Sequence, residues 1–166
     1  ELKYKVVVYI GQRVDEIDQI SISVKSAVIA KSFQTFHNDK DISYYEETLE
    51  KKSRLYGMDK NIIESLIRAA EENDRERIET LIDKIYEDFK KYNVDPDIIN
   101  LNIDYLLYCL IHLANELDPD ADQEEVLENI RKCAFNQIAV RGSAIHFKKF
   151  VVEFAGYLSQ LRQNTS

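Results

Sequence analysis

The sequence of 166 residues is poor in the residues that make tight turns, with only 4 glycines and 2 prolines. Sandwiches and barrels need many such turns, so this shortage argues against an all-β fold. No apolar run approaches the roughly 18 residues that span a bilayer. No cationic segment followed by an apolar one forms a signal peptide at the start. We therefore expect a cytoplasmic protein that does not enter a membrane.

Cysteine is also scarce, since the chain holds only Cys109 and Cys133. Both lie in apolar patterns typical of helices, and neither belongs to a CxxC motif. The favoured interpretation is two reduced, buried thiols in a cytosolic protein. A disulfide or a metal-binding pair is the alternative.

The motifs that bind phosphate or perform common hydrolytic chemistry are missing. The sequence contains no GxxxxGK[ST], GxGxxG, HExxH or GxSxG pattern and no EF-hand loop. Its glycines, at positions 11, 57, 142 and 156, are too far apart to build a glycine-rich phosphate cradle. The usual nucleotide-binding motifs are therefore excluded.

The composition is that of a globular protein with an acidic body, at 45% hydrophobic and 31% charged residues. The formal net charge is -8. Residues 1–57 carry nine basic and nine acidic side chains, so the whole excess lies in residues 58–166. A surface of this sign repels phosphate backbones and anionic membranes. We expect neither nucleic acid nor membrane to bind this segment.

The first part of the chain predicts a β-α-β arrangement. Residues 4–10 form a β-branched run closed by Gly11, which indicates a buried strand. Residues 20–24 alternate as a strand would, but the longer stretch 15–36 follows helical spacing without Gly or Pro, and its length favours a helix. Residues 42–45 make a second short strand. Two strands are only part of a sheet, so more strands are expected from upstream.

From Asp59 onward, apolar residues recur at helical spacing. One stripe spans 62–70, and a second spans 78–89 behind a capping box formed by Asn73 and Glu76. Asp95-Pro96 opens a third helix, because proline is tolerated at the first helical position. That helix runs to Leu117 and is apolar nearly all round, which predicts a central, buried position.

Two further helices are indicated after Asp118-Pro119-Asp120. One carries apolar residues over 126–134 and stops at Gly142, with Ser143 as the cap of the last helix. Apolar residues of the last helix form a seam: Phe147, Val151, Phe154, Leu158 and Leu161. Such a seam suits either packing on the bundle or association of two chains. The predicted fold is mostly α, with a short N-terminal β-α-β remnant followed by an α-helical bundle of about five helices.

His112 is the histidine with the most suggestive neighbours. It lies one helical turn from both Tyr108 and Glu116, so the three side chains share a predicted face. One interpretation is a general base oriented by a carboxylate, or half of a metal site. The favoured one is a surface histidine hydrogen-bonded to Glu116.

The remaining polar candidates have structural explanations. His37 falls in a polar turn and His146 in a first helical turn, where solvation or capping accounts for each. The acidic clusters at 118–122 and 124–125 lack the central glycine and final glutamate of a calcium loop. They are better suited to ending one helix and favouring the start of the next. We predict no catalytic, cofactor-binding or metal site.

The order of elements resembles the end of a degenerate GGDEF-like domain followed by a helical region. The residues that carry the resemblance are Tyr9-Ile10-Gly11, Val14, Ile17, Ser23, Ala27, Tyr44-Tyr45-Glu46, Glu71-Glu72-Asn73-Asp74 and Leu81-Ile82. The arrangement is similar to the central region of two-component response regulators with a receiver domain first and an AraC-type helix-turn-helix last. The resemblance implies a partial β-α-β segment, residues 1–57, and a helical bundle ending in a linker helix, residues 58–166.

The same resemblance implies a non-enzymatic connector of a cytoplasmic transcription regulator. We expect a homodimer whose sensor histidine kinase and DNA are contacted through domains absent from this chain, with paired 147–161 helices setting the spacing of the DNA-reading domains. The start at Glu1 and the end at Asn164-Thr165-Ser166 fit an excerpt from a longer polypeptide. The alternatives are a small-molecule-sensing helical domain of a transcription regulator and an unrelated helical protein-interaction adaptor.

Overall fold

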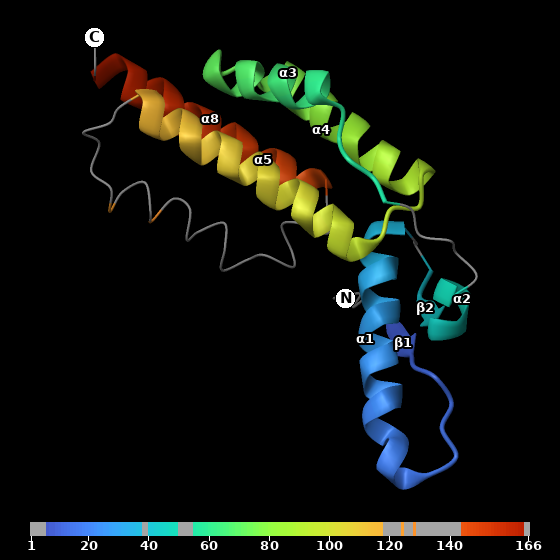
Figure 1. Ribbon diagram of the computed structural model, residues 1–166. Helices are drawn as coiled ribbons and strands as arrows, with labels where there is room; N and C mark the ends of the chain where they lie inside the picture. Colours follow the sequence, from blue (N-terminus) through green and yellow to red (C-terminus); the bar gives the residue numbers. More distant parts are fainter. Residues whose placement is uncertain are drawn as a thin grey trace, which may run out of the picture. The chain divides into compact units, whose positions relative to one another are not determined.

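The computed structural model describes residues 6–37, 40–49, 55–117, 124, 128 and 144–164. Within these ranges the chain is mostly helical, with two short strands near the N-terminus, which confirms the predicted fold class (Figure 1). The chain divides into two compact units. One comprises the residues up to Leu55 together with Phe89–Pro96, and the other comprises Tyr56–Asp88 and the residues from Asp97 onward.

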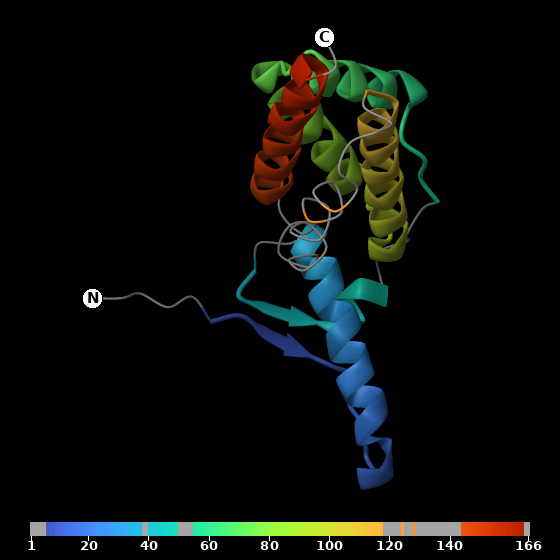
Figure 2. The same cartoon turned by 90° about the vertical axis from the view of Figure 1, so that its left-hand side faces the viewer.

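The first unit contains a two-stranded parallel sheet and a long helix. Strand β1 (Val8–Ile10) pairs with β2 (Ile42–Tyr44), in a register that places Tyr9 opposite Ser43. A 3-10 turn (Ile17–Gln19) leads into α1 (Ile20–His37), which lies beside both strands (Figure 2). The helical interpretation of this stretch is therefore confirmed over the strand alternative. A short helix α2 (Tyr45–Leu49), which the sequence did not reveal, follows β2 directly.

Gly11 allows the chain after β1 to lie against α1. A Cβ atom at this position would overlap the carbonyl oxygen of Ser23 and come within 2.9 Å of Ser26 Oγ. The same buried hydroxyl accepts the backbone N–H of Gln12 at 2.7 Å. The glycine predicted to close the strand thus also fixes the distance between strand and helix.

The second unit is built from four described helices: α3 (Lys60–Glu71), α4 (Arg75–Lys91), α5 (Pro96–Leu117) and α8 (Ala144–Asn164). α4 runs on past Asp88, so its last residues are grouped with the first unit. The predicted helix over 126–134, with Gly142 and Ser143, lies outside the described residues. None of the described helices is both long and apolar enough to cross a membrane.

Asparagine replaces glycine at two helix ends of this glycine-poor chain. Asn73 and Asn93 have positive φ angles of 54° and 47°, which glycine and asparagine adopt most readily. The amides after them reach back to Ala69 and Phe89, as in a Schellman motif. Asn73 therefore ends α3, and the prediction that it caps α4 is wrong.

The residue that caps α4 is Asp74. Its carboxylate accepts the backbone N–H of Arg77 at 3.1 Å. Asp59 caps α3 in the same way, by accepting the N–H of Asn61 at 2.8 Å. An aspartate at each helix start suits the partial positive charge there.

The core of the helical unit consists of one apolar seam from each helix. The buried residues are Leu66, Ala69 and Ala70 of α3, Ile78, Ile82 and Ile85 of α4, Ile99, Ile103, Leu106, Leu110 and Leu113 of α5, and Phe147, Val151, Phe154, Leu158 and Leu161 of α8. The α8 seam is thus used for packing on the bundle. Of the two roles predicted for it, association of two chains through this seam is wrong, because its side chains are already buried.

Polar pairs at both ends hold α8 on the bundle. Lys148 donates to Asp83 of α4 at 2.8 Å, and Arg162 donates to Glu71 of α3 at 2.6 Å. The rings of Phe147 and Tyr86 also lie 6.2 Å apart. α8 is therefore a member of the bundle along its described length.

Candidate functional site

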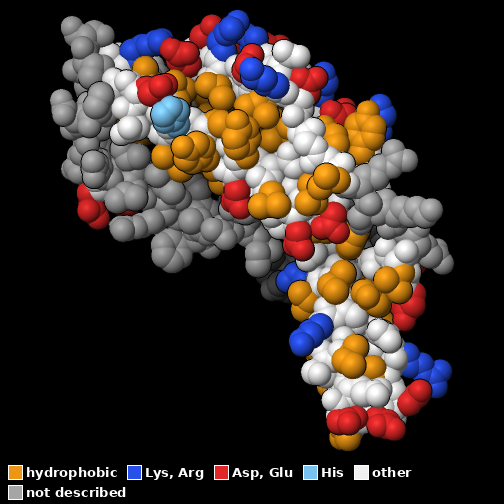
Figure 3. Space-filling view, in the orientation of Figure 1, with side chains coloured by type: hydrophobic (Ala, Val, Ile, Leu, Met, Phe, Trp, Pro, Cys, Tyr) orange, Lys and Arg blue, Asp and Glu red, His pale blue; other side chains and the backbone are white. Residues whose placement is uncertain are grey.

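The α5 face opposite the core is exposed. Leu101, Tyr105 and Tyr108 are 63%, 53% and 64% exposed, and apolar side chains gather along this helix in Figure 3. The prediction of a helix buried all round is therefore wrong for this face. The sequence showed apolar side chains on every side of α5, but it did not show how many sides have neighbours.

His112 continues this face, as predicted. Its ring is stacked parallel to that of Tyr108, with centroids 6.3 Å apart, and its Nε2 lies 3.4 Å from Glu116 Oε1. Both members of the His–Glu pair are more than half exposed. Among the residues that the structure describes, no group of three His, Cys, Asp or Glu side chains could hold a metal ion. The geometry is that of a solvent-exposed i,i+4 pair.

Tyr105 and Cys109 form a second pair on α5. A side-chain hydrogen bond with Cys109 raises the pKa of Tyr105, so the phenol stays protonated at neutral pH. Cys109 is a free thiol and is half-buried, which corrects the prediction that it is fully buried. Cys133 lies outside the described residues.

The other candidates from the sequence contribute no assembled site. His146 is exposed in the first turn of α8. The side chain of His37 is outside the described set, as are the acidic clusters at 118–122 and 124–125, except for Glu124, which is exposed. For the residues outside the described set, the predictions made from the sequence remain predictions.

A shallow groove of about 520 Å³ lies between the first turns of α4 and α8. It is lined by Arg75, Glu79, Ile145, Lys148, Lys149, Val152 and Glu153. Each cation in it has a carboxylate neighbour: Glu79 for Arg75, Asp83 for Lys148 and Glu153 for Lys149. Binding sites for small molecules usually enclose most of the ligand, whereas this groove is open and its charged side chains are paired with one another or with Asp83.

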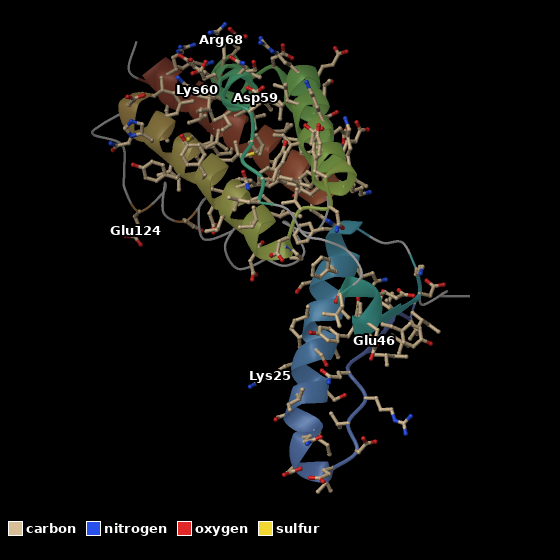
Figure 4. All side chains as sticks on the ribbon, turned by 45° about the vertical axis from the view of Figure 1, so that its right-hand side comes forward. Lys25, Glu46, Asp59, Lys60, Arg68 and Glu124 are labelled. Carbon is tan, nitrogen blue, oxygen red and sulfur yellow. The ribbon has the colours of Figure 1, made fainter. Side chains whose placement is uncertain are left out.

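The segment that enters the helical unit, residues 56–59, is fixed to α5 by Asn102. We call it the entry segment. The Asn102 side chain accepts the N–H of Met58 at 3.1 Å and donates to the carbonyl oxygens of Tyr56 and Ile98 at 3.1 and 2.7 Å. Tyr56 also donates its hydroxyl to Asp88 of α4 at 3.4 Å. The segment runs from there to Asp59 and Lys60, which are labelled in Figure 4. Sequence reasoning missed this role, because Asn102 reads as one polar residue in an apolar helix.

The first unit leaves apolar side chains uncovered on two sides. On the sheet, Val8, Ile10, Ile42 and Tyr44 share one face and are all exposed. Alternate residues of the strands face α1, where Ser43 is buried. Parallel sheets are normally covered on both faces. The sheet of the first unit is therefore covered on one face only.

The exposed side of α1 is the second uncovered surface. Ile17, Ile20, Val24 and Val28 recur at helical spacing on the side opposite Ser26, which faces the strand segment. No family model, curated protein or solved structure matches this chain. Its surfaces and contacts are therefore the basis for assigning a role.

Proposed function

We propose that this chain is a non-catalytic regulatory and dimerisation connector of a two-component response regulator that controls transcription. In this role it links a phosphorylatable receiver domain to a DNA-binding domain. The observation that carries the proposal is the incomplete first unit, whose sheet has one exposed apolar face, in a chain that also contains a separate helical unit. A connector is expected to expose surfaces that adjoining domains or a second copy complete.

The anchored entry segment supports the same role. Asn102 and Asp88 bond to residues 56–58, just after the point where the chain leaves the first unit. In the proposed role, a displacement that reaches residues 56–58 acts on α4 and α5 through these bonded contacts. Such coupling requires different contacts in the two signalling states.

The charge distribution supports the proposal that DNA is bound by another domain. Residues 58–166 hold the whole net charge of -8, which opposes approach to phosphates. We expect the 166-residue chain to leave duplex DNA unshifted in a mobility assay at about 150 mM salt. Tight binding under these conditions would contradict the proposal.

The decisive experiment uses the full-length protein that contains this chain. Its sequence is expected to contain a receiver aspartate upstream and two helix-turn-helix units downstream. Phosphorylating the receiver with a small acyl phosphate should raise the affinity for target DNA, and replacing the receiver aspartate with alanine should abolish that response. Flanking sequence without these domains would refute the proposal in favour of an unrelated adaptor.

A thermal-shift screen of the chain separates the connector from a small-molecule sensor. A ligand that binds only the folded state raises the melting temperature in proportion to the logarithm of its concentration. The connector role predicts no such response to metabolites. A saturable shift that is lost on Lys149→Glu, which reverses a charge in the α4–α8 groove, would instead support sensing.

A further inference from the structure

The exposed stripe of α1 consists of Ile20, Val24 and Val28 of the helix together with Ile17 of the 3-10 turn before it, and all four are β-branched. Ile17 is 86% exposed, Ile20 is 50% exposed, and Val24 and Val28 are each 58% exposed. The opposite side of the helix carries Ser26, Ala30 and Phe33, which are buried, and Ile22, which is 48% exposed. A helix that is apolar on both sides is normally enclosed on both sides. The stripe therefore needs a partner.

The spacing of the stripe makes it complementary to itself in an antiparallel arrangement. If two copies of α1 cross at Val24, each Val24 meets its counterpart, and Ile20 of one copy lies opposite Val28 of the other. Isologous pairing about a two-fold axis is the commonest way in which identical chains associate.

Charge supports the same direction of pairing. The N-terminal end of the stripe carries Asp15, Glu16 and Asp18, of which Asp15 pairs with Arg13 at 3.8 Å, whereas Lys31 follows its C-terminal end. Antiparallel packing brings the acidic end of one copy against the basic end of the other, while parallel packing brings like charges together. Opposed helix dipoles favour the antiparallel arrangement as well.

A second copy is also better matched to this stripe than to the exposed face of α5. The segment that contains α1, residues 1–57, has no net charge, so two copies approach without repulsion. α5 belongs to the segment with net charge -8, and Asp104 and Glu116 flank its exposed face. Like charges across an interface oppose association.

We propose that the α1 stripe is a self-association surface on which the α1 helix of a second copy packs antiparallel, crossing at Val24. The inference deepens the proposed function, because it rests on the connector being dimeric and names the surface. Interfaces that bury less than about 1,200 Å² in total are weak and reversible. Four partly exposed aliphatic side chains per copy belong to this class. A reversible dimer suits a module whose pairing is controlled by adjoining domains.

The first test is sedimentation of the 166-residue chain from about 1 to 300 µM, a range that brackets weak interfaces. We expect a reversible monomer–dimer equilibrium, and Val24→Asp should raise the dissociation constant tenfold or more. The matched control is Leu101→Asp, which places the same charge on the exposed face of α5 and should leave the equilibrium unchanged. A chain that stays monomeric, or a dimer broken by the control instead, refutes the proposal.

A charge-reversal cycle tests the direction of packing. Asp18→Lys and Lys31→Asp should each weaken the dimer several-fold, and the double variant should recover most of the wild-type affinity. Additive losses in the double variant would contradict an antiparallel contact between these ends.

Disulfide trapping gives an independent geometric test in a background with Cys109→Ser and Cys133→Ser. Val24→Cys should cross-link on oxidation, because the two positions face each other at the crossing. Val28→Cys should not, since helical rise separates its two copies by about 12 Å along the axis, beyond the roughly 7 Å limit for a disulfide. Efficient trapping at both positions would indicate parallel packing and overturn the proposal.

The outcome is separable from that of the proposed function. A monomeric chain with phosphorylation-dependent DNA binding in the full-length protein would refute only the α1 surface. A Val24-dependent dimer flanked by neither a receiver nor a helix-turn-helix would refute only the regulatory role.

Discussion

Replacing Asn102 with alanine should release the entry segment from the helical unit. The substitution removes the partners of the Met58 N–H and the Tyr56 carbonyl, together with the bond to Ile98. A typical hydrogen bond contributes about 0.5–1.5 kcal/mol. The site is only partly buried, so water restores some of the loss. We expect the local free energy of opening to fall by about 2 kcal/mol, which corresponds to roughly a 30-fold larger opening constant.

Amide exchange of Met58 and chymotryptic cleavage at Tyr56 report this opening directly, because both track the open population when closing is fast. Both rates should rise about 30-fold in Asn102→Ala. Asn115→Ala is the matched control, since Asn115 is exposed on the same helix and carries the same change in helix propensity. Equal rates in wild type and Asn102→Ala, or an equal increase in the control, would refute the assignment.

Asn102→Asp adds a pH dependence to the same test. The new carboxyl can accept the Met58 N–H, but when ionised it faces two carbonyl oxygens that need donors. This environment raises its folded pKa above the unfolded value of about 3.9. Its contribution to stability is therefore present below about pH 4 and lost as the pH rises through the folded pKa. The variant should resemble wild type at low pH and Asn102→Ala at pH 7, and a pH-independent defect would contradict this geometry.

Two further substitutions test the packing within each unit. Phe147→Ala should lower the free energy of unfolding of the helical unit by about 3–5 kcal/mol, because the ring is fully buried. Its control, Ile145→Ala, is at an exposed position of the same helix and should change this free energy by under about 0.5 kcal/mol. Urea unfolding followed by circular dichroism measures both. Gly11→Ala should expose the first unit to proteolysis, because the added methyl overlaps the Ser23 carbonyl, whereas Gly57→Ala, with open space around it, should not. If either variant had the same effect as its control, the packing described for that unit would be contradicted.

Periodicity predicted the helices because each has one seam buried in the bundle. Ile78, Ile82 and Ile85 of α4 and the seam of α8 repeat with a helical period and are buried. The two strands were predicted over 4–10 and 42–45, and they form over Val8–Ile10 and Ile42–Tyr44. These features depend on side chains close together in the sequence, so local pattern suffices. The prediction that the first strand is buried is wrong, because Val8 and Ile10 are exposed on the uncovered face of the sheet.

The errors concern features that depend on partners distant in the sequence. Leu101 has the side chain of a core residue and lies on a bare face, since no described element covers it. Asn73 and Asp74 are both good capping residues, and only the backbone conformation shows that Asn73 adopts positive φ and Asp74 caps. Asn102 acquires its role from Met58, 44 residues earlier. None of these partners can be inferred from spacing along one helix.

The distribution of charge and apolar surface assigns different tasks to the two units. The helical unit buries a seam from each described helix and belongs to the segment that carries the negative charge, so two copies of it repel each other. The segment 1–57, which contains α1, has no net charge, and the α1 stripe is exposed. This difference in charge favours the proposed pairing of two copies at α1 over pairing through α5. If two copies pair at α1 as proposed, Asn102→Ala should loosen residues 56–58 from α5 without weakening the dimer itself.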